Sequence, residues 1–398
     1  MKPILLSSLT AASCIGTGLE ATRASLRAGR SGLVPCRFED ATLPCWIGEV
    51  AGLDQVTLPA DLVRFDCRNN RLAQLALAQD GFAEAVAAAA GRHGRERVGV
   101  LLGTSTAGIL TTEHAYRRRD AGSGALPADF DYRGTHNIHS VSDFVRQACA
   151  LEGPALAVSS ACSSSAKVFA TAARMIEVGL IDAAVVGGVD SLCLTTLYGF
   201  NSLELLSPEP CRPFDAGRRG ISIGEAAAFV LLERAPDVVS NEAIVLRGYG
   251  ESSDAHHMSS PHPEGLGARL AMEAALARAD LAPTDIDYIN LHGTATPSND
   301  SAEGRAVADL FGRTVPASST KGYTGHALGA AGGLEAVIAA IALQDGAIPG
   351  SAGTRTADPA IGIDYVLTPR SRPIVHVLSN SFGFGGTNAS LILSRGSR

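Results

Sequence analysis

The sequence predicts an α/β protein built from layers of helices packed on strands. Short apolar runs alternate with longer stretches of helical periodicity along the whole chain, which is typical of α/β layering. Apolar residues make up 46% of the 398 residues and charged residues 18%, so the chain can form a large core and is not disordered. Glycine accounts for 43 of the 398 residues, about 11% against a usual share of about 7%, and it favours tight turns and close backbone approaches.

The elements follow one another in a regular order. The first apolar run, after Met1, predicts a buried strand that leads into a turn near Ser13; its single lysine and interrupting hydroxyls do not suit a signal peptide. Further strands are predicted at residues 98–102, 155–158, 183–186, 227–232, 286–291 and 374–378. Helices are predicted at residues 71–90, 164–178, 268–279, 301–310 and 330–343. The polar stretch at 236–242 is the expected internal seam.

Charge and cysteine content exclude several classes of protein. The net charge of -7, from 33 basic and 40 acidic residues, is wrong for general nucleic-acid binding. The eight cysteines form no C-x-x-C pair and no zinc-ligand spacing, so we expect reduced thiols in a cytoplasmic protein and no metal site. No run approaches the roughly 20 apolar residues that a membrane-spanning helix needs.

The segment 155–190 carries the first candidate for chemistry. A buried strand ends in Ser159–Ser165, a helix follows, and a second strand ends in Gly187-Gly188. Cys162 lies at the turn, where the N–H groups and positive end of the helix favour a thiolate. A core cysteine after a strand is the alternative interpretation, and the local pattern only modestly favours a nucleophile.

Three later segments share this arrangement of a strand, a glycine-containing turn and a further element. His292 closes an apolar strand before hydroxyls and a tight turn, and Glu303 follows on the next helix. The stretch 318–332 carries His326 together with Lys321, one of only three lysines in the chain. The last segment, 379–388, is a glycine-laced turn between two strands. A lone histidine at a strand end is usually structural, so these segments are informative mainly in combination.

Taken together, the four segments resemble the β-ketoacyl-acyl carrier protein synthases of the I/II type, the condensing enzymes of fatty acid and polyketide synthesis. The resemblance covers essentially the whole chain and includes residues 211–215, 224–226 and 253–258. It implies the thiolase fold, in which two similar lobes form five α-β-α-β-α layers. The lobes are expected at 1–240, with the nucleophilic cysteine, and at 241–398, with two catalytic histidines.

The resemblance also implies roles for individual residues. A Cys-His-His triad falls on Cys162, His292 and His326: the thiolate takes an acyl group as a thioester, and two neutral histidines stabilise the enolate from malonyl-carrier. The N–H groups of Cys162 and Phe384 are expected to form the oxyanion hole, and the Phe384 ring is expected to gate the acyl pocket. Lys321 and Glu335 are expected to form a buried ion pair, and Glu303 is expected to support the site. The expected substrate contacts are Thr294, Thr296, Thr106 and Phe382.

Departures from the family pattern suggest a subgroup. Ala295 stands where the family usually has Gly or Ser, residues 220–227 read Gly-Ile-Ser-Ile-Gly-Glu-Ala-Ala, and Thr106 stands where housekeeping enzymes often have Ile. This combination looks most like the condensing enzymes of bacterial aryl polyene pigment pathways, and a smaller residue at 106 would suit a rigid polyene. The alternatives are a housekeeping enzyme of fatty acid elongation and a synthase subunit that is active only with a partner like a chain-length factor.

The resemblance implies an acyl carrier protein as partner and a dimer, either of identical chains or with a related subunit. The substrates ride on the phosphopantetheine arm of the carrier, so no separate cofactor is expected. Arg117–Arg119 or the group of Arg64, Arg68 and Arg71 could dock an acidic carrier, although solvated arginines are the commoner case. A thiolase lacks support because no cysteine follows Cys211, and an inactive chain-length factor would lack the cysteine nucleophile.

Overall fold

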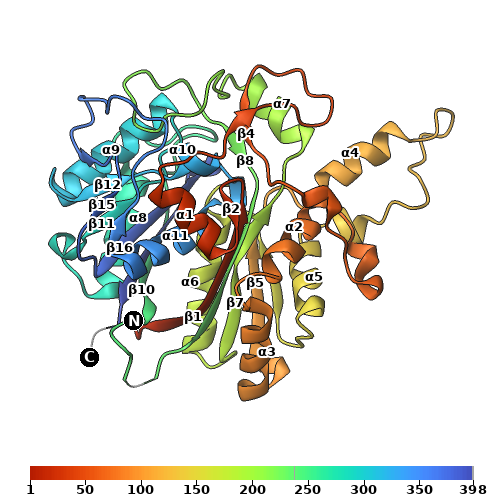
Figure 1. Cartoon of the computed structure of the whole chain (residues 1–398), viewed down its shortest axis with the longest axis horizontal. Coiled ribbons are helices and arrows are strands. Elements are labelled where there is room, and N and C mark those ends of the chain that lie inside the picture. The colour runs from red at the N-terminus through yellow and green to blue at the C-terminus, as the bar shows by residue number, and fades with distance from the viewer. Residues whose placement is uncertain (237, 397–398) are drawn as a thin grey trace.

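The computed structural model describes residues 1–236 and 238–396, and its centre is a 12-stranded sheet in two halves (Figure 1). The first half contains β1 (Ile4–Ser13), β5 (Val98–Gly103), β6 (Ala155–Val158), β7 (Ala183–Asp190) and β9 (Ala226–Arg234). The second half contains β10 (Ile244–Ser253), β11 (Tyr288–Asn290), β12 (Pro316–Ser318), β16 (His376–Gly383) and β17 (Thr387–Arg395).

The two halves have the same topology. The spatial order is β6-β5-β7-β9-β1 in the first half and β12-β11-β16-β17-β10 in the second, so each places its third, second, fourth, fifth and first strands side by side. In both, the three strands farthest from the junction are parallel, and the last two alternate in direction. The halves join where β1 pairs antiparallel with β10. The duplicated arrangement matches the two similar lobes that the sequence predicts.

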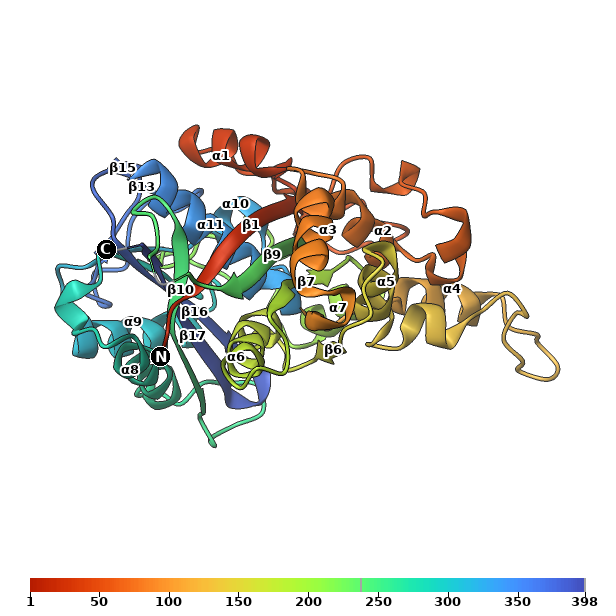
Figure 2. The same ribbon diagram turned by 90° about the horizontal axis from the view of Figure 1, so that it is seen from below.

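Helices form three layers around the sheet halves (Figure 2). The helices α6 (Ser164–Glu177) and α11 (Ala331–Asp345) contact each other and strands of both halves, so they form the central layer. The outer helices are α2 (Arg68–Leu77), α3 (Phe82–His93) and α5 (Ser140–Ala148) on the first half, and α8 (Leu266–Ala279) and α9 (Pro297–Phe311) on the second. The predicted five-layer α-β-α-β-α fold is therefore confirmed.

The remaining elements are short or peripheral. The other helices are α1 (Leu19–Arg27), α4 (Ile109–Arg117), α7 (Leu194–Ser202) and α10 (Lys321–Thr324). The short strands are β2 (Gly16–Thr17), β3 (Val34–Pro35), β4 (Trp46–Gly48), β8 (Ile223–Gly224), β13 (Ala347–Ile348), β14 (Asp364–Tyr365) and β15 (Arg370–Ser371).

The sequence located the central elements well and misjudged one helix. The helix predicted at 71–90 is wrong, because the chain breaks between α2 and α3, where Asp80 (φ 57°) and Gly81 (φ 66°) have left-handed backbone conformations. The Asp80 carboxylate accepts hydrogen bonds from the Leu19 N–H and from the Thr10 hydroxyl, which holds the break in place. Apolar periodicity alone does not reveal such a tertiary contact.

The central helix α11 explains one apolar segment. Residues Leu328–Asp345 have a mean hydropathy of 1.3 and are the one helical segment, within 1–236 and 238–396, that is long and apolar enough to cross a membrane. That segment is 89% buried inside the protein, as expected for the core helix of a layered fold. The lobe boundary between 240 and 241 remains a proposal; it falls in the connection from β9 to β10, whose residue 237 lies outside the described residues, as do 397–398 at the end of the second lobe.

Candidate active site

Cys162 is held at the turn between β6 and the central helix α6. Ala161 takes a left-handed conformation (φ 51°), which turns the chain sharply at the end of the strand. The Ser164 hydroxyl accepts a hydrogen bond from Ser160 N–H (2.9 Å) and donates to the Ala161 carbonyl (2.5 Å), so it braces the turn from inside. The Cys162 side chain is consequently presented at the N-terminus of α6 while only 7% exposed.

His326 approaches Cys162 from the equivalent position of the second half. It lies just before η6 (Leu328–Ala330), the single turn that leads into the other central helix, α11. Its backbone N–H donates to the Ser222 carbonyl (2.7 Å), and its Nε2 lies 3.0 Å from Cys162 Sγ. Because α6 and α11 lie side by side in the middle layer, Cys162 and His326 meet at the N-terminal ends of these helices, although they are 164 positions apart in the chain.

His292 is placed by the strand β11 and by a buried carboxylate. The turn after β11 bends at Gly293, which has φ 40°. The rings of His292 and His326 lie edge to face, with their centroids 5.3 Å apart. The Glu303 carboxylate accepts hydrogen bonds from the backbone N–H groups of His292 and Gly293, each at 2.8 Å. Glu303, on α9, therefore fixes the backbone from which the His292 ring projects.

Lys321 sets the tautomer of His292. Its ammonium is buried, forms a short ion pair with Glu335 and donates to the His292 carbonyl (2.6 Å). It also lies 3.4 Å from His292 Nδ1. Since an ammonium only donates, Nδ1 accepts, and the proton of the neutral ring resides on Nε2. The Nε2–H is thus left for the pocket that His292 lines.

Burial dominates the electrostatics of these groups. The pKa values of His292 and His326 lie well below the usual range, first because both rings are buried and then because Lys321 is close. Both histidines are therefore neutral hydrogen-bonding groups at neutral pH. Burial also raises the pKa of Cys162 to about 11, although Lys321 and the backbone N–H groups of Phe384 and Cys162 lower it. The expected helix-stabilised thiolate is thus not the resting form, and the sulfur is a thiol beside His326.

The supporting carboxylates share this burial. It raises the pKa of Glu303 to about 7, against the backbone N–H groups that it accepts from. It likewise raises the pKa of Glu335 to about 7, and the Lys321 ammonium opposes that rise. These side chains are buried behind the histidines and do not line the pocket, so they can act only by holding other groups.

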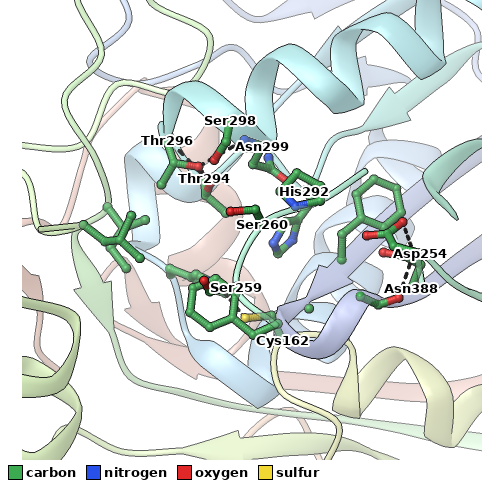
Figure 3. Close-up of a pocket in the computed structure, with 18 of the residues that line it drawn as sticks. Cys162, Asp254, Ser259, Ser260, His292, Thr294, Thr296, Ser298, Asn299 and Asn388 are labelled. Atoms are coloured by element: carbon green, nitrogen blue, oxygen red, sulfur yellow. Dashed lines mark hydrogen bonds between the residues drawn. The ribbon is translucent and has the colours of Figure 1, made fainter. Parts of the chain in front are cut away.

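A pocket of roughly 600 Å³, partly open to solvent, leads to this cluster (Figure 3). One side of the pocket is rich in hydroxyl groups, and Figure 3 shows Thr294, Thr296, Ser298 and Ser260 gathered there. The Thr294 and Thr296 hydroxyls hydrogen-bond each other at 2.9 Å. The apolar wall is made by Phe200, Leu205, Ile221, Phe382 and Phe384.

Phe384 closes one side of this wall. Its ring packs on Phe200 of α7 with centroids 5.8 Å apart. The next residue, Gly385, has φ 81° and open space around its α-carbon, and its N–H donates to the Met258 carbonyl at 2.7 Å. The predicted gate therefore lies on a glycine turn that is anchored from outside by a neighbouring loop.

The structure brings most of the predicted site residues together, with one exception. Cys162, His292, His326, Thr294, Thr296, Phe382 and Phe384 all line the pocket, while Lys321, Glu335 and Glu303 lie directly behind the histidines. Thr106 does not line it: this side chain is buried and its hydroxyl donates to Asp190 at 2.8 Å. A direct contact of Thr106 with substrate in this pocket is therefore not supported.

Some arginines of the two predicted docking clusters are paired with carboxylates, and others are exposed. Arg68 is turned inward onto the buried carboxylate of Glu225 (2.7 Å), and its side chain is only 8% exposed. Arg71 pairs with Asp66 at 2.6 Å, and Arg117 pairs with Asp40 at 3.1 Å. Arg64 is exposed, with its guanidinium over the Phe65 ring.

Sequence reasoning missed several pocket residues. Phe200 and Leu205 come from segments without any motif, whereas Ile221 lies in the segment 220–227, which the sequence analysis used only to suggest a subgroup. Ser259 and Ser260 directly follow residues 253–258, a segment of the resemblance to which the sequence analysis assigned no role in the site. Hydroxyl residues directly after a histidine-rich loop were the signal that could have found them.

The ligand atoms of Cys162, His292 and His326 lie within 4.8 Å of one another, a spacing that could also hold a metal ion. The ammonium of Lys321 lies 3.4 Å from His292 Nδ1, and a second cation beside it would be repelled. The arrangement suits a thiol and two neutral hydrogen-bond donors better than it suits a metal.

Family models match both halves of the chain. The family model "Beta-ketoacyl synthase, N-terminal domain" matches residues 1–237, and "Beta-ketoacyl synthase, C-terminal domain" matches residues 243–355. The 3-oxoacyl-[acyl-carrier-protein] synthase 2 of Coxiella burnetii is 34% identical, over 99% of each chain.

Solved structures extend the match to the fold. The ketosynthase ApeO, in complex with its chain length factor ApeC from Xenorhabdus doucetiae, superposes with a TM-score of 0.87 at 39% identity, over 99% of this chain and 98% of that one. The ishigamide ketosynthase/chain length factor superposes with a TM-score of 0.88 at 27% identity, over 100% of each chain. Cluster, fold and sequence thus agree, and the chain belongs to the beta-ketoacyl synthase family.

Proposed function

We propose that this chain is a β-ketoacyl-acyl carrier protein synthase, an acyltransferase that condenses malonyl-carrier with an acyl chain held on Cys162. The observation that carries the proposal is the position of His326 Nε2, 3.0 Å from Cys162 Sγ, with His292 lining the same pocket. A nucleophilic sulfur beside two neutral histidines suits carbon–carbon bond formation, in which an enolate must be stabilised without being protonated.

In the first half-reaction, Cys162 Sγ attacks the carbonyl of an acyl-carrier thioester. The carbon–sulfur bond to the phosphopantetheine arm breaks, a new thioester forms on Cys162, and the thiol proton leaves with the carrier sulfur. The backbone N–H groups of Cys162 and Phe384 both lower the pKa of the reacting thiol, which supports their use as donors to the oxyanion.

In the second half-reaction, malonyl-carrier occupies the same pocket and loses carbon dioxide. The electron pair of the broken bond forms an enolate, whose thioester oxygen would accept hydrogen bonds from Nε2–H of His292 and His326. The enolate carbon then attacks the acyl carbonyl and the Cys162 thiolate leaves. The product is a β-ketoacyl chain on the carrier, longer by two carbons.

The neighbouring residues take supporting roles. Thr294 and Thr296 would hydrogen-bond the phosphopantetheine arm on the hydroxyl-rich side of the pocket, and Phe384 with Phe382 would admit and contact the acyl chain. Lys321 and Glu335 hold the tautomer of His292, and Glu303 holds its backbone. The phosphopantetheine arm belongs to the substrate, so this chemistry calls on no separate cofactor.

The proposed pathway is aryl polyene or related fatty acid and polyketide elongation. The pocket wall is built largely of aromatic and branched apolar side chains, which suits an extended, unsaturated chain. The ketosynthase ApeO and the ishigamide ketosynthase are each described together with a chain length factor. We therefore extend the proposal to a dimer, either of identical chains or with a related subunit of that kind, that takes its substrates from an acyl carrier protein.

The test is intact-mass spectrometry of the protein and its carrier after mixing with acyl-carrier and malonyl-carrier. We expect an acyl adduct on the wild type, none on Cys162→Ala, and a carrier product extended by two carbons. Cys149→Ala, a thiol at the end of α5 outside the pocket, is the matched control and should behave as wild type. Aryl-polyenoyl and saturated donors are compared to separate a pigment pathway from housekeeping elongation. No adduct and no product, with a related subunit present or absent, would contradict the proposal.

A further inference from the structure

A buried carboxylate outside the pocket connects the two catalytic half-sites. Asp190 is the last residue of β7, and its side chain is fully buried. It forms no ion pair with any residue in the described part of the chain. A buried, unpaired carboxylate is costly unless hydrogen-bond donors surround it, and here they do.

One carboxylate oxygen holds the loop after β5. Asp190 Oδ1 accepts hydrogen bonds from the N–H groups of Ser105 (2.7 Å) and Thr106 (2.8 Å). It also accepts from the hydroxyls of Thr104 (2.9 Å) and Thr106 (2.8 Å). Both threonine side chains at this loop are therefore directed at Asp190 rather than at the pocket.

The other carboxylate oxygen holds the turn that follows His326. Asp190 Oδ2 accepts the Gly329 N–H at 2.5 Å, and Gly329 lies in η6, three residues after His326. The contact is tight, because a β-carbon at position 329 would lie 2.7 Å from both Asp190 Oδ2 and Ser105 Oγ. Ser105 in turn donates to the Ala161 carbonyl (3.5 Å), immediately before Cys162. One carboxylate thus links the loop after β5 to the turns that carry both reacting side chains.

We propose that Asp190 is a positioning residue that holds the His326 turn in register with Cys162, and that it serves condensation more than acyl transfer. This inference rests on the proposed function. His326 is held 3.0 Å from Cys162 Sγ by its backbone, which bonds to Ser222 and Gly224, and by the turn after it, which Asp190 anchors through Gly329. The brace that Ser164 gives to Cys162 does not depend on Asp190, so loss of the Gly329 anchor displaces the histidine more than the nucleophile.

The decisive variant is Asp190→Asn. The amide oxygen can still accept from the loop after β5, but the amide NH₂ would face the Gly329 N–H, and two donors cannot bond. Displacement of a catalytic group by about 1 Å can slow a reaction roughly 100-fold. We therefore expect single-turnover condensation, started from enzyme already acylated on Cys162, to fall about 10- to 100-fold, with the acylation rate changed less than about threefold.

Alkylation of Cys162 by iodoacetamide gives an independent readout. The Asp190 charge raises the pKa of Cys162, so the neutral asparagine should bring more thiolate at a given pH and faster alkylation. Asp182→Asn, just before the opposite end of β7, is the matched control and should leave all three rates unchanged.

Gly329→Ala provides a second variant, because its methyl group pushes the turn away while the Asp190 charge stays. We expect the same selective loss of condensation without faster alkylation, and this variant decides the question if Asp190→Asn does not fold. Equal losses of acylation and condensation, or condensation at the wild-type rate, would overturn the role of Asp190. A wild type that acylates but does not condense would instead contradict the proposed function and this inference with it.

Discussion

Replacing Lys321 by methionine removes the cation behind the catalytic histidines while nearly preserving side-chain length. Lys321 is 1% exposed and Glu335 is 3% exposed, so the ion pair is shielded from water on both sides. The substitution leaves the Glu335 carboxylate without its partner and removes the donors to the carbonyl and Nδ1 of His292. Stability and catalysis should therefore both fall, for separate reasons.

The expected magnitudes follow from the burial of the pair. Loss of one partner from a buried ion pair costs about 3 to 5 kcal/mol of unfolding free energy. Glu335 already has a pKa raised to about 7 by burial, so without Lys321 it takes up a proton at neutral pH, which limits the cost toward the lower value. A free His292 Nδ1 no longer fixes the proton on Nε2, and loss of one oxyanion donor slows such reactions roughly 100- to 1000-fold.

A second variant separates the two effects. In Lys321→Met combined with Glu335→Leu, both charges are replaced by apolar side chains, which is often neutral for stability. Denaturant unfolding should show recovery of most of the lost stability, whereas malonyl-carrier decarboxylation by the acylated enzyme should stay slow. Lys167→Met, at a half-buried position of α6, is the matched control for loss of a lysine. Decarboxylation near the wild-type rate in a folded Lys321→Met protein would refute the role assigned to Lys321.

Four further variants test other parts of the structure. Burial raises the pKa of Glu303 from 4.5 to about 7, which corresponds to roughly 3 kcal/mol of stability that is present below about pH 4.5 and lost as the pH rises through 7. Glu303→Gln should flatten this decline in the unfolding free energy measured from pH 4 to 8. Arg68→Ala should lower the unfolding free energy by about 3 to 5 kcal/mol, because it leaves the buried carboxylate of Glu225 without its partner. An Arg68→Ala protein as stable as the wild type would contradict this expectation. Arg64→Glu should leave stability unchanged and raise the KM for the carrier in low salt. Phe384→Ala should slow Cys162 acylation and weaken discrimination between donors in competition assays, and unchanged selectivity would argue against a gate.

The sequence determined the order of strands and helices and pointed to candidate reacting groups. Strand ends followed by glycine and hydroxyl residues marked Cys162, His292 and His326 only as candidates, and their proposed roles came from the combined resemblance of four segments to the β-ketoacyl synthases. The scarcity of lysine drew attention to Lys321. Local patterns of this kind involve residues that are neighbours in the sequence, so they can be recognised without knowledge of the fold.

Only the tertiary structure decided how these groups interact. Two duplicated halves bring the N-termini of α6 and α11 together, so Cys162 and His326 meet although no local pattern relates them. Burial, which depends on every surrounding element, makes the sulfur a thiol instead of the expected thiolate. Thr106 was predicted to contact substrate, but the carboxylate of Asp190 draws its hydroxyl away from the pocket. Charge, proton position and side-chain direction depend on contacts distant in sequence, and those contacts exist only once the chain is folded.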